Sequence, residues 1–122
     1  PAGNALVTSL HESKILTVII ETKGGHQANS SDGGSDGKPG IPTIGINPNK
    51  QDINGEKVPL FAAVAHELGH AQEFINGTAL PEDKKSHAAK TPGTTPKDEQ
   101  GAVNTENAVR KEHNIPERKS YF

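Results

Sequence analysis

Residues 59–77 read PLFAAVAHELGHAQEFING and predict a helix that is apolar on most of its surface. We expect it to begin near Val58, with Pro59 in its first turn, and to end at Asn76-Gly77, where Gly77 supplies the left-handed residue that follows many helices. His66 and His70 are four residues apart, so both imidazoles lie on one face and can reach one Zn²⁺. Glu67 is turned about 100° from His66, where its carboxylate can act as a general base on a water beside the metal.

The surroundings of this HExxH motif favour a metal site over a chance match. Two histidines and a glutamate are costly in a buried helix unless something pairs them, and a metal ion does so. The alternative is a helix that carries surface histidines and an exposed glutamate without any metal. The apolar neighbours that argue against this alternative are Leu60, Phe61, Ala62, Ala63, Val64, Ala65, Leu68 and Ala71.

Length and composition narrow the class of protein. The 122 residues predict a single domain, residues 1–122, with a lean core, because only 30% are hydrophobic and 3% aromatic. The net charge of −2, without a basic cluster among aromatics, argues against nucleic acid as a partner. No apolar run is long enough for a membrane span, and the absence of cysteine excludes thiolate ligands and disulfides. We expect a monomer, without a signal peptide, that is a piece of a longer protein because it begins at Pro1.

The segments before the motif predict one helix and two strands. Residues 2–12 have helical spacing, while residues 14–21, KILTVIIE, and 41–47, IPTIGIN, are rich in β-branched residues. Pro42 favours an edge position for the second strand, and an edge strand can hold a peptide substrate by β-augmentation. Residues 22–40 predict a mobile Gly/Ser-rich loop, either a plain surface loop or a flap over the cleft. Asn54 and Gly55 predict a turn.

Two short helices are expected after a second loop at about residues 78–95. The first begins at Thr95–Asp98, a capping-box-like sequence, and runs towards Val103; the second begins at Asn104–Glu106 and ends before Pro116. In the second helix we expect Glu106 and Arg110 to form a surface ion pair. His26 and His87 lie in the two loops, where solvent exposure is the expectation.

A catalytic zinc needs three protein ligands and one open position, and HExxH supplies two. Asn76 stands six residues after His70, where the metzincin pattern has its third histidine, so that class is excluded. A carboxylate on a following helix is then the natural third ligand. Spacing does not separate Glu99 from Glu106. The downstream candidates together are Asp83, His87, Asp98, Glu99, Glu106, Glu112 and His113.

Four sequence features stand out together: the HELGHA core at residues 66–71, the acidic pair Asp98-Glu99, the Glu-Asn-x-x-Arg run at 106–110 and the Arg-x-x-Tyr at 118–121. Through these features, residues 40–122 resemble the M91 family of metallopeptidase effector domains, and the N-terminal part fits more loosely. The core is also similar to clostridial neurotoxin light chains. The family's Thr and Gly after the acidic pair are replaced here by Gln100-Gly101-Ala102, so Glu106 stays as the alternative third ligand.

The resemblance implies a small zincin-like α+β domain, with a few-stranded sheet on the HExxH helix and C-terminal helices. It implies Zn²⁺ held by His66, His70 and Glu99, with Glu67 as the catalytic base. Arg118 and Tyr121 would stabilise the oxyanion.

The function it implies is a zinc endopeptidase toxin or effector, of the type III or Rhs-repeat kind. Such a virulence factor is secreted or injected, cleaves a protein in the recipient cytoplasm and has a cognate immunity protein. The alternatives are a non-toxin zinc peptidase fragment and a non-catalytic zinc-stabilised interaction module, against which Glu67 argues.

Overall fold

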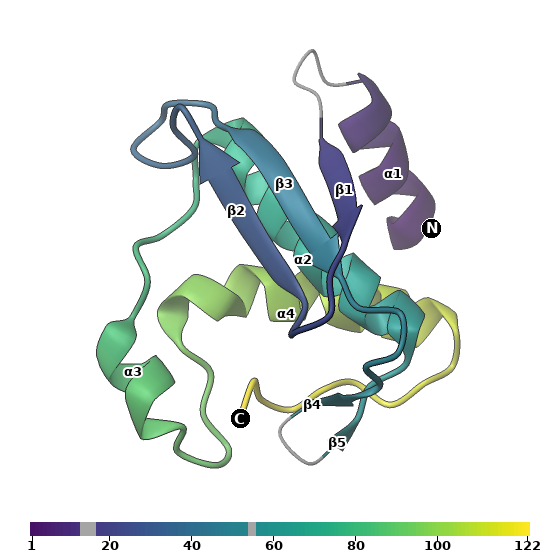
Figure 1. The fold of residues 1–122 in the computed structure, drawn as a ribbon. Helices are drawn as coiled ribbons and strands as arrows, with labels where there is room; N and C mark the ends of the chain where they lie inside the picture. Colours follow the sequence, from purple (N-terminus) through teal and green to yellow (C-terminus); the bar gives the residue numbers. More distant parts are fainter. Residues whose placement is uncertain (13–16, 54–55) are drawn as a thin grey trace.

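A computed structural model describes residues 1–12, 17–53 and 56–122 and has an α+β fold (Figure 1). The beginning of the predicted strand, residues 14–16, and the turn predicted at Asn54-Gly55 lie outside the described residues. The elements in chain order are α1 (Ala2–Glu12), β1 (Val18–Glu21), β2 (Gln27–Ser31), β3 (Ile41–Ile46), β4 (Asp52–Ile53), β5 (Glu56–Lys57), α2 (Leu60–Asn76), α3 (Lys84–Ala89) and α4 (Lys97–Glu112).

The main sheet has three strands in the order β1-β3-β2, and β4 and β5 form a separate antiparallel pair. β1 runs parallel to β3, with Val18 opposite Thr43, and β2 runs antiparallel to β3. The prediction that residues 41–47 form an edge strand is therefore wrong, because β3 lies in the centre. Pro42 is tolerated there because the pairing of β3 with β1 begins only at Thr43, so Pro42 precedes the first β1–β3 pair.

The stretch 22–40, expected as an irregular loop, contains β2 and a glycine-rich turn packed on the end of α2. Backbone hydrogen bonds join Gly37 N–H to Gly77 O, Gly40 N–H to Phe74 O and Ala79 N–H to Gly34 O. Gly34 has φ +112, and a side chain there would come within 2.6 Å of Ser30 Oγ. The order in this segment was not predicted from its polar composition, because backbone hydrogen bonds and close glycine contacts stabilise it rather than apolar side chains.

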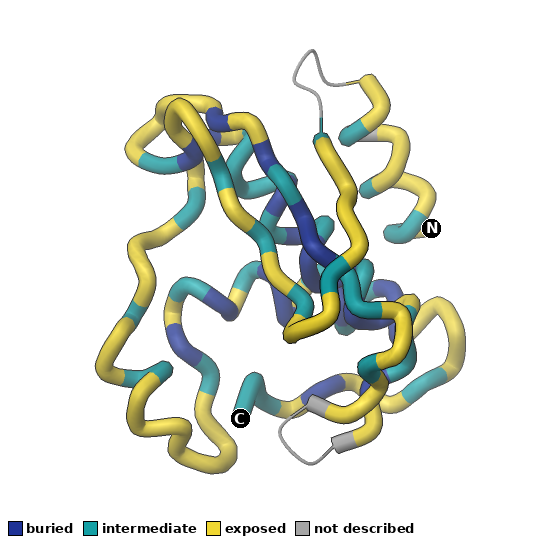
Figure 2. Tube along the Cα trace, viewed as in Figure 1, coloured by how far each residue is buried: buried dark blue, intermediate teal, exposed yellow. Residues whose placement is uncertain are grey.

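α2 ends where the sequence predicts, begins two residues after the predicted start near Val58, and lies against both the sheet and α4. It begins after Pro59 and ends at Gly77, which has φ 69 and donates its N–H to Phe74 O. The side of α2 that meets α4 carries Gly69, whose missing side chain lets the helices approach closely: an added Cβ would lie 3.2 Å from Ala102 Cα. The buried positions follow β3, α2 and α4, while the outer elements are exposed (Figure 2).

α4 is one continuous helix, where two short helices were expected. The predicted start at Asn104–Glu106 lies in its middle, and Thr105 Oγ1 donates to Gly101 O within the helix. Thr95 does not cap the helix; its Oγ1 accepts from Tyr121 N–H instead. Continuity places Glu99 and Glu106, two turns apart, on the same face towards α2.

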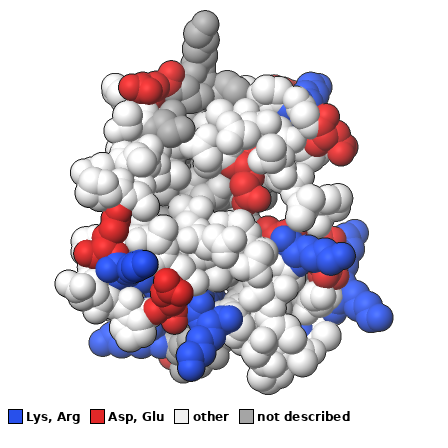
Figure 3. All heavy atoms as spheres, turned by 180° about the vertical axis from the view of Figure 1, so that it is seen from behind, with Lys and Arg blue, Asp and Glu red and all other residues white. Residues whose placement is uncertain are grey.

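Within the predicted second loop, residues 84–89 form the short helix α3. The Asp83 side chain caps it by accepting from Ser86 N–H. None of the helices among the described residues is long and apolar enough to cross a membrane. On the face opposite that of Figure 1, acidic and basic side chains are interspersed rather than gathered by sign (Figure 3).

Candidate metal centre

Three predicted ligands meet where α2 crosses α4. Glu99 Oε1 lies 2.9 Å from His66 Nε2 and 2.9 Å from His70 Nε2. The two imidazole rings are edge-on, with centroids 5.1 Å apart. His66 and Glu99 are buried, and the side chain of His70 is 14% exposed. Two imidazole nitrogens and one carboxylate oxygen, all within 4.8 Å of one another, form a donor set that suits Zn²⁺.

Each of the two histidines has a carboxylate at its other ring nitrogen. His66 Nδ1 lies 3.0 Å from Glu106 Oε1, and His70 Nδ1 lies 3.3 Å from Glu73 Oε1. Such carboxylates fix the ring orientation and leave Nε2 to face a metal. Glu106 therefore stands behind His66, on the side away from the three converging donor atoms.

Glu106 is fully buried among cations. Its Oε2 accepts from Arg110 Nε at 2.7 Å, and its Oε1 accepts from Arg118 Nη1 at 3.0 Å. The expectation of a surface ion pair between Glu106 and Arg110 is wrong, since both side chains are buried where α4 packs on α2. The charges and the His66 hydrogen bond hold the pKa of Glu106 below its ordinary value, against the effect of burial.

These contacts determine which of the side chains carry a proton when no metal is bound. Burial lowers the pKa of His70, but hydrogen bonds to Glu73 and Glu99 outweigh it and raise the value to about 10. The pKa of His66 is also raised, because bonds to Glu106 and Glu99 overcome burial. Glu99 has its pKa lowered well below the usual range by the two imidazoles, despite burial. Without a metal, the protonated imidazoles are therefore hydrogen-bonded to the carboxylate of Glu99, in the place where a cation would bind all three side chains.

Glu67 lies beside this group and is only 8% exposed. Burial raises the pKa of its carboxyl, and the neighbouring His66 and His70 act in the opposite direction. A carboxylate with a raised pKa next to a metal site has the basicity that a general base needs. Its position on α2 follows from the helical rotation after His66.

The C-terminal tail returns to the same centre. The Arg118 guanidinium donates to Glu106, to Ser120 O at 3.0 Å and to Tyr121 O at 2.8 Å. It also lies 5.0 Å from the centre of the Tyr121 ring. That ring packs against His66, with centroids 5.7 Å apart. Burial and the charges of Glu99 and Glu67 raise the pKa of Tyr121, so its phenol keeps its proton at neutral pH.

Two cavities are each lined in part by Glu67 and Tyr121. One of about 280 Å³ extends towards Lys50, Lys90 and Arg118, and one of about 440 Å³ runs along β2 towards Glu82 and Asp98. His26 lines both, but it is not solvated as expected. Its Nδ1 accepts from Asn47 N–H at 3.1 Å and its Nε2 donates to Lys50 O at 3.2 Å, so both ring nitrogens are engaged within the protein.

Two residues of this region, Glu73 and His87, have contacts at the site that the sequence analysis did not predict. Glu73 is three residues after His70 on the same helical face, a signal that was present in the sequence. His87, expected in solvent, bonds Asp98 Oδ2 through Nε2 at 2.9 Å and packs edge-on against Tyr121. No local pattern indicated this contact, because it depends on how the segment with α3 brings His87 to Asp98 at the start of α4.

Comparison with known proteins agrees with these observations. A family model for M91 peptidases, described as an effector protein, matches residues 1–121. No curated protein and no solved structure matches the chain. Because the family model spans nearly the whole sequence, the chain belongs to the M91 peptidase family of effector proteins.

Proposed function

We propose that this peptidase-type effector is a zinc-dependent endopeptidase. The observation that carries the proposal is the convergence of His66 Nε2, His70 Nε2 and Glu99 Oε1 beside Glu67, in a cleft. The donor set fits zinc, and both imidazoles have the outer carboxylate that metal-binding histidines usually have. We assign Glu99 as the third ligand, since Glu106 faces the opposite nitrogen of His66.

The catalytic work of the protein falls on Glu67. When bound, zinc would supply the Lewis acidity that makes a water nucleophilic near neutral pH. The Glu67 carboxylate accepts a proton from the water that attacks the scissile carbonyl, and it later delivers that proton to the leaving amine. Burial, which raises the pKa of Glu67, favours both transfers.

Tyr121 and Arg118 serve the oxyanion side in different ways. Tyr121 lies against His66 and keeps its phenolic proton, so it can donate to the oxygen that gains charge. Arg118 is engaged with Glu106 and the carbonyls of Ser120 and Tyr121. We therefore propose that Arg118 positions Tyr121, rather than donating to the oxyanion itself.

The β2 strand is the edge at which we propose the substrate backbone adds. β2 is the last strand of the described sheet on that side, and Gln27, Ala28 and Asn29 line the larger cavity with Glu67 and His70. An extended peptide paired with β2 would pass along the metal centre. This role moves from β3, where the sequence placed the edge, to β2.

We propose that the substrate is a protein of a recipient cell, into which the effector is delivered as a monomer. Membership of an effector family supports delivery and a protein substrate. We also propose that this domain is part of an Rhs-type toxin and that a cognate immunity protein inhibits it. A non-catalytic zinc module is disfavoured because a structural site has no need of a buried carboxylate beside the three donors.

The test compares wild type with Glu67→Gln for zinc content and for cleavage of a peptide library read by mass spectrometry. Both should hold zinc at the centre, while the variant loses at least about 100-fold in cleavage rate. Glu117→Gln, an exposed change on the tail, is the matched control and should behave as wild type. A wild type that takes up no zinc, or a Glu67→Gln variant that cleaves equally well, would refute the proposal.

A further inference from the structure

A second group of side chains, of the types that commonly bind metals, lies next to the first. His87 Nε2 on α3 is 2.9 Å from Asp98 Oδ2 and 3.8 Å from Glu99 Oε2 on α4. The three donor atoms lie within 4.8 Å of one another, as do those of the first group. The side chains are mostly buried, with exposures of 23% for His87, 11% for Asp98 and 10% for Glu99.

Glu99 belongs to both groups through different oxygens. Its Oε1 faces the imidazoles of His66 and His70, and its Oε2 faces that of His87. One carboxylate directed at two sets of donors is the arrangement that bridges paired metal ions, which lie about 3.5–4 Å apart. Asp98 and Glu99 are adjacent in the first turn of α4. Asp98 can therefore face the second group while Glu99 faces both.

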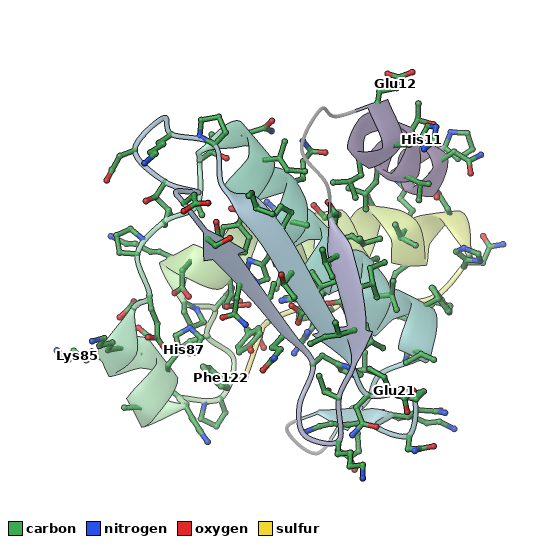
Figure 4. The ribbon with its side chains drawn as sticks, turned by 45° about the horizontal axis from the view of Figure 1, so that its top comes forward. His11, Glu12, Glu21, Lys85, His87 and Phe122 are labelled. Atoms are coloured by element: carbon green, nitrogen blue, oxygen red, sulfur yellow. The ribbon has the colours of Figure 1, made fainter. Side chains whose placement is uncertain are left out.

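The second group is held in place by contacts of its own. Asp98 Oδ1 accepts from Asp83 N–H at 3.0 Å, and Asp83 also caps α3, the helix that carries His87. The His87 ring packs edge-on against Phe122 at 6.0 Å and Tyr121 at 5.7 Å. Figure 4 shows His87 beside Phe122, on the opposite side of α3 from Lys85. The donors are therefore oriented before any ion arrives.

We propose that His87 Nε2, Asp98 Oδ2 and Glu99 Oε2 bind a second divalent cation, with Zn²⁺ as the best fit. One imidazole nitrogen and two carboxylate oxygens suit zinc, and water completes the coordination. The cation takes the place of the proton between His87 and Asp98. All three side chains line the larger cavity, so the site is reached from the cleft. The bridging role of Glu99 rests on the proposed function, whereas binding through His87 and Asp98 does not.

The experiment measures zinc uptake by the chelator-treated chain in equilibrium dialysis against rising free Zn²⁺. Wild type should take up two zinc ions, the second more weakly. His87→Ala and Asp98→Asn should each keep the first ion and weaken the second by more than tenfold. His11→Ala on α1 and Lys85→Ala on α3 are matched controls, both exposed and remote from the donors, and should keep two (Figure 4). Circular dichroism checks that each variant is folded.

Cobalt substitution tests the shared carboxylate directly. With two Co²⁺ bound, spin coupling through Glu99 should lower the paramagnetic resonance intensity per cobalt relative to one Co²⁺, and His87→Ala should abolish that loss. Uptake that stops at one ion, lost in His70→Ala but kept in His87→Ala, would overturn the second site and leave the proposed function standing. A second ion unaffected by both His87→Ala and Asp98→Asn would do the same. A single ion that depends on His87 but not on His70 would support the second site and refute the proposed zinc centre.

Discussion

Glu99 and Glu106 contact the same imidazole from opposite sides: Glu99 Oε1 lies 2.9 Å from His66 Nε2, and Glu106 Oε1 lies 3.0 Å from His66 Nδ1. Only Glu99 also reaches His70 Nε2. The two acids are equivalent in the sequence, but the structure gives them different neighbours. One completes a group of three donors, and the other is held by two arginines.

From this difference we expect Glu99→Ala to lose the first zinc and Glu106→Ala to keep it with lower affinity. Removing a ligand leaves only two donors, whereas loss of an outer carboxylate typically costs about 10–100-fold in affinity. Isothermal titration with Zn²⁺ measures both variants, with Glu117→Ala as control. The reverse result, zinc lost with Glu106→Ala alone, would exchange the two assignments.

Glu73 should contribute to zinc affinity through His70. Its Oε1 is buried and lies 3.3 Å from His70 Nδ1, which is ion-pair distance. Glu73→Ala frees the ring to rotate, so the first zinc should bind about 10–100-fold more weakly. Glu73→Gln, which can still accept from Nδ1–H, should recover most of the loss. Equal affinities in all three proteins would show that the contact is incidental.

Gly69→Ala should destabilise the protein by about 1–3 kcal/mol. The new methyl would lie 3.0 Å from Thr105 Cβ and 3.2 Å from Ala102 Cα, and the backbone of α4 cannot yield without moving the helix. This clash outweighs the gain in helix propensity of about 1 kcal/mol. Urea unfolding measures the change.

Gly24→Ala is the control for that measurement, since nothing lies within 4 Å of the added carbon. Because α4 carries Glu99, the Gly69 variant should also bind zinc less tightly. Unchanged stability would mean that α2 and α4 are less closely packed than the structure shows.

Arg118→Ala should release the tail from the metal centre. The guanidinium holds the carbonyls of Ser120 and Tyr121 and the carboxylate of Glu106. Tyr121 is the single tyrosine of a chain without tryptophan, so its fluorescence reports on the tail alone. Acrylamide should quench that fluorescence more strongly in Arg118→Ala than in wild type or in Lys119→Ala, an exposed neighbour. Identical quenching would contradict a positioning role for Arg118.

The metal-free protein should lose stability as the pH rises. His70 has a pKa of about 10 in the fold, above its ordinary 6.5, so its contribution is complete below pH 6.5 and is lost by about pH 10. The lowered pKa of Glu99 acts at the other end, since its contribution is lost as the solution becomes acidic. Thermal unfolding in chelator should show a falling midpoint between pH 6.5 and 10.

Two controls accompany the pH series. Zinc-loaded protein should not show the alkaline loss, because the metal takes the place of the imidazole protons. His70→Gln in chelator should lose part of the alkaline fall, since one of the two imidazoles whose pKa is raised is gone and His66 remains. A metal-free midpoint that stays level from pH 6.5 to 10 would contradict the protonated state inferred for His70.

The family resemblance in the sequence implied the α+β class. Its local patterns determined where α2 ends and that His66, Glu67 and His70 lie on it. These features depend on helical period and end residues, which act over a few neighbouring positions. Tertiary structure decided the rest. Glu99 and Glu106 could be told apart only once α4 was seen to be one continuous helix with a definite orientation against α2. The central position of β3 could not be predicted because its neighbour β2 has a polar sequence that does not resemble a strand. The contacts of His87 and Arg118 join segments whose approach depends on packing, which no local pattern encodes.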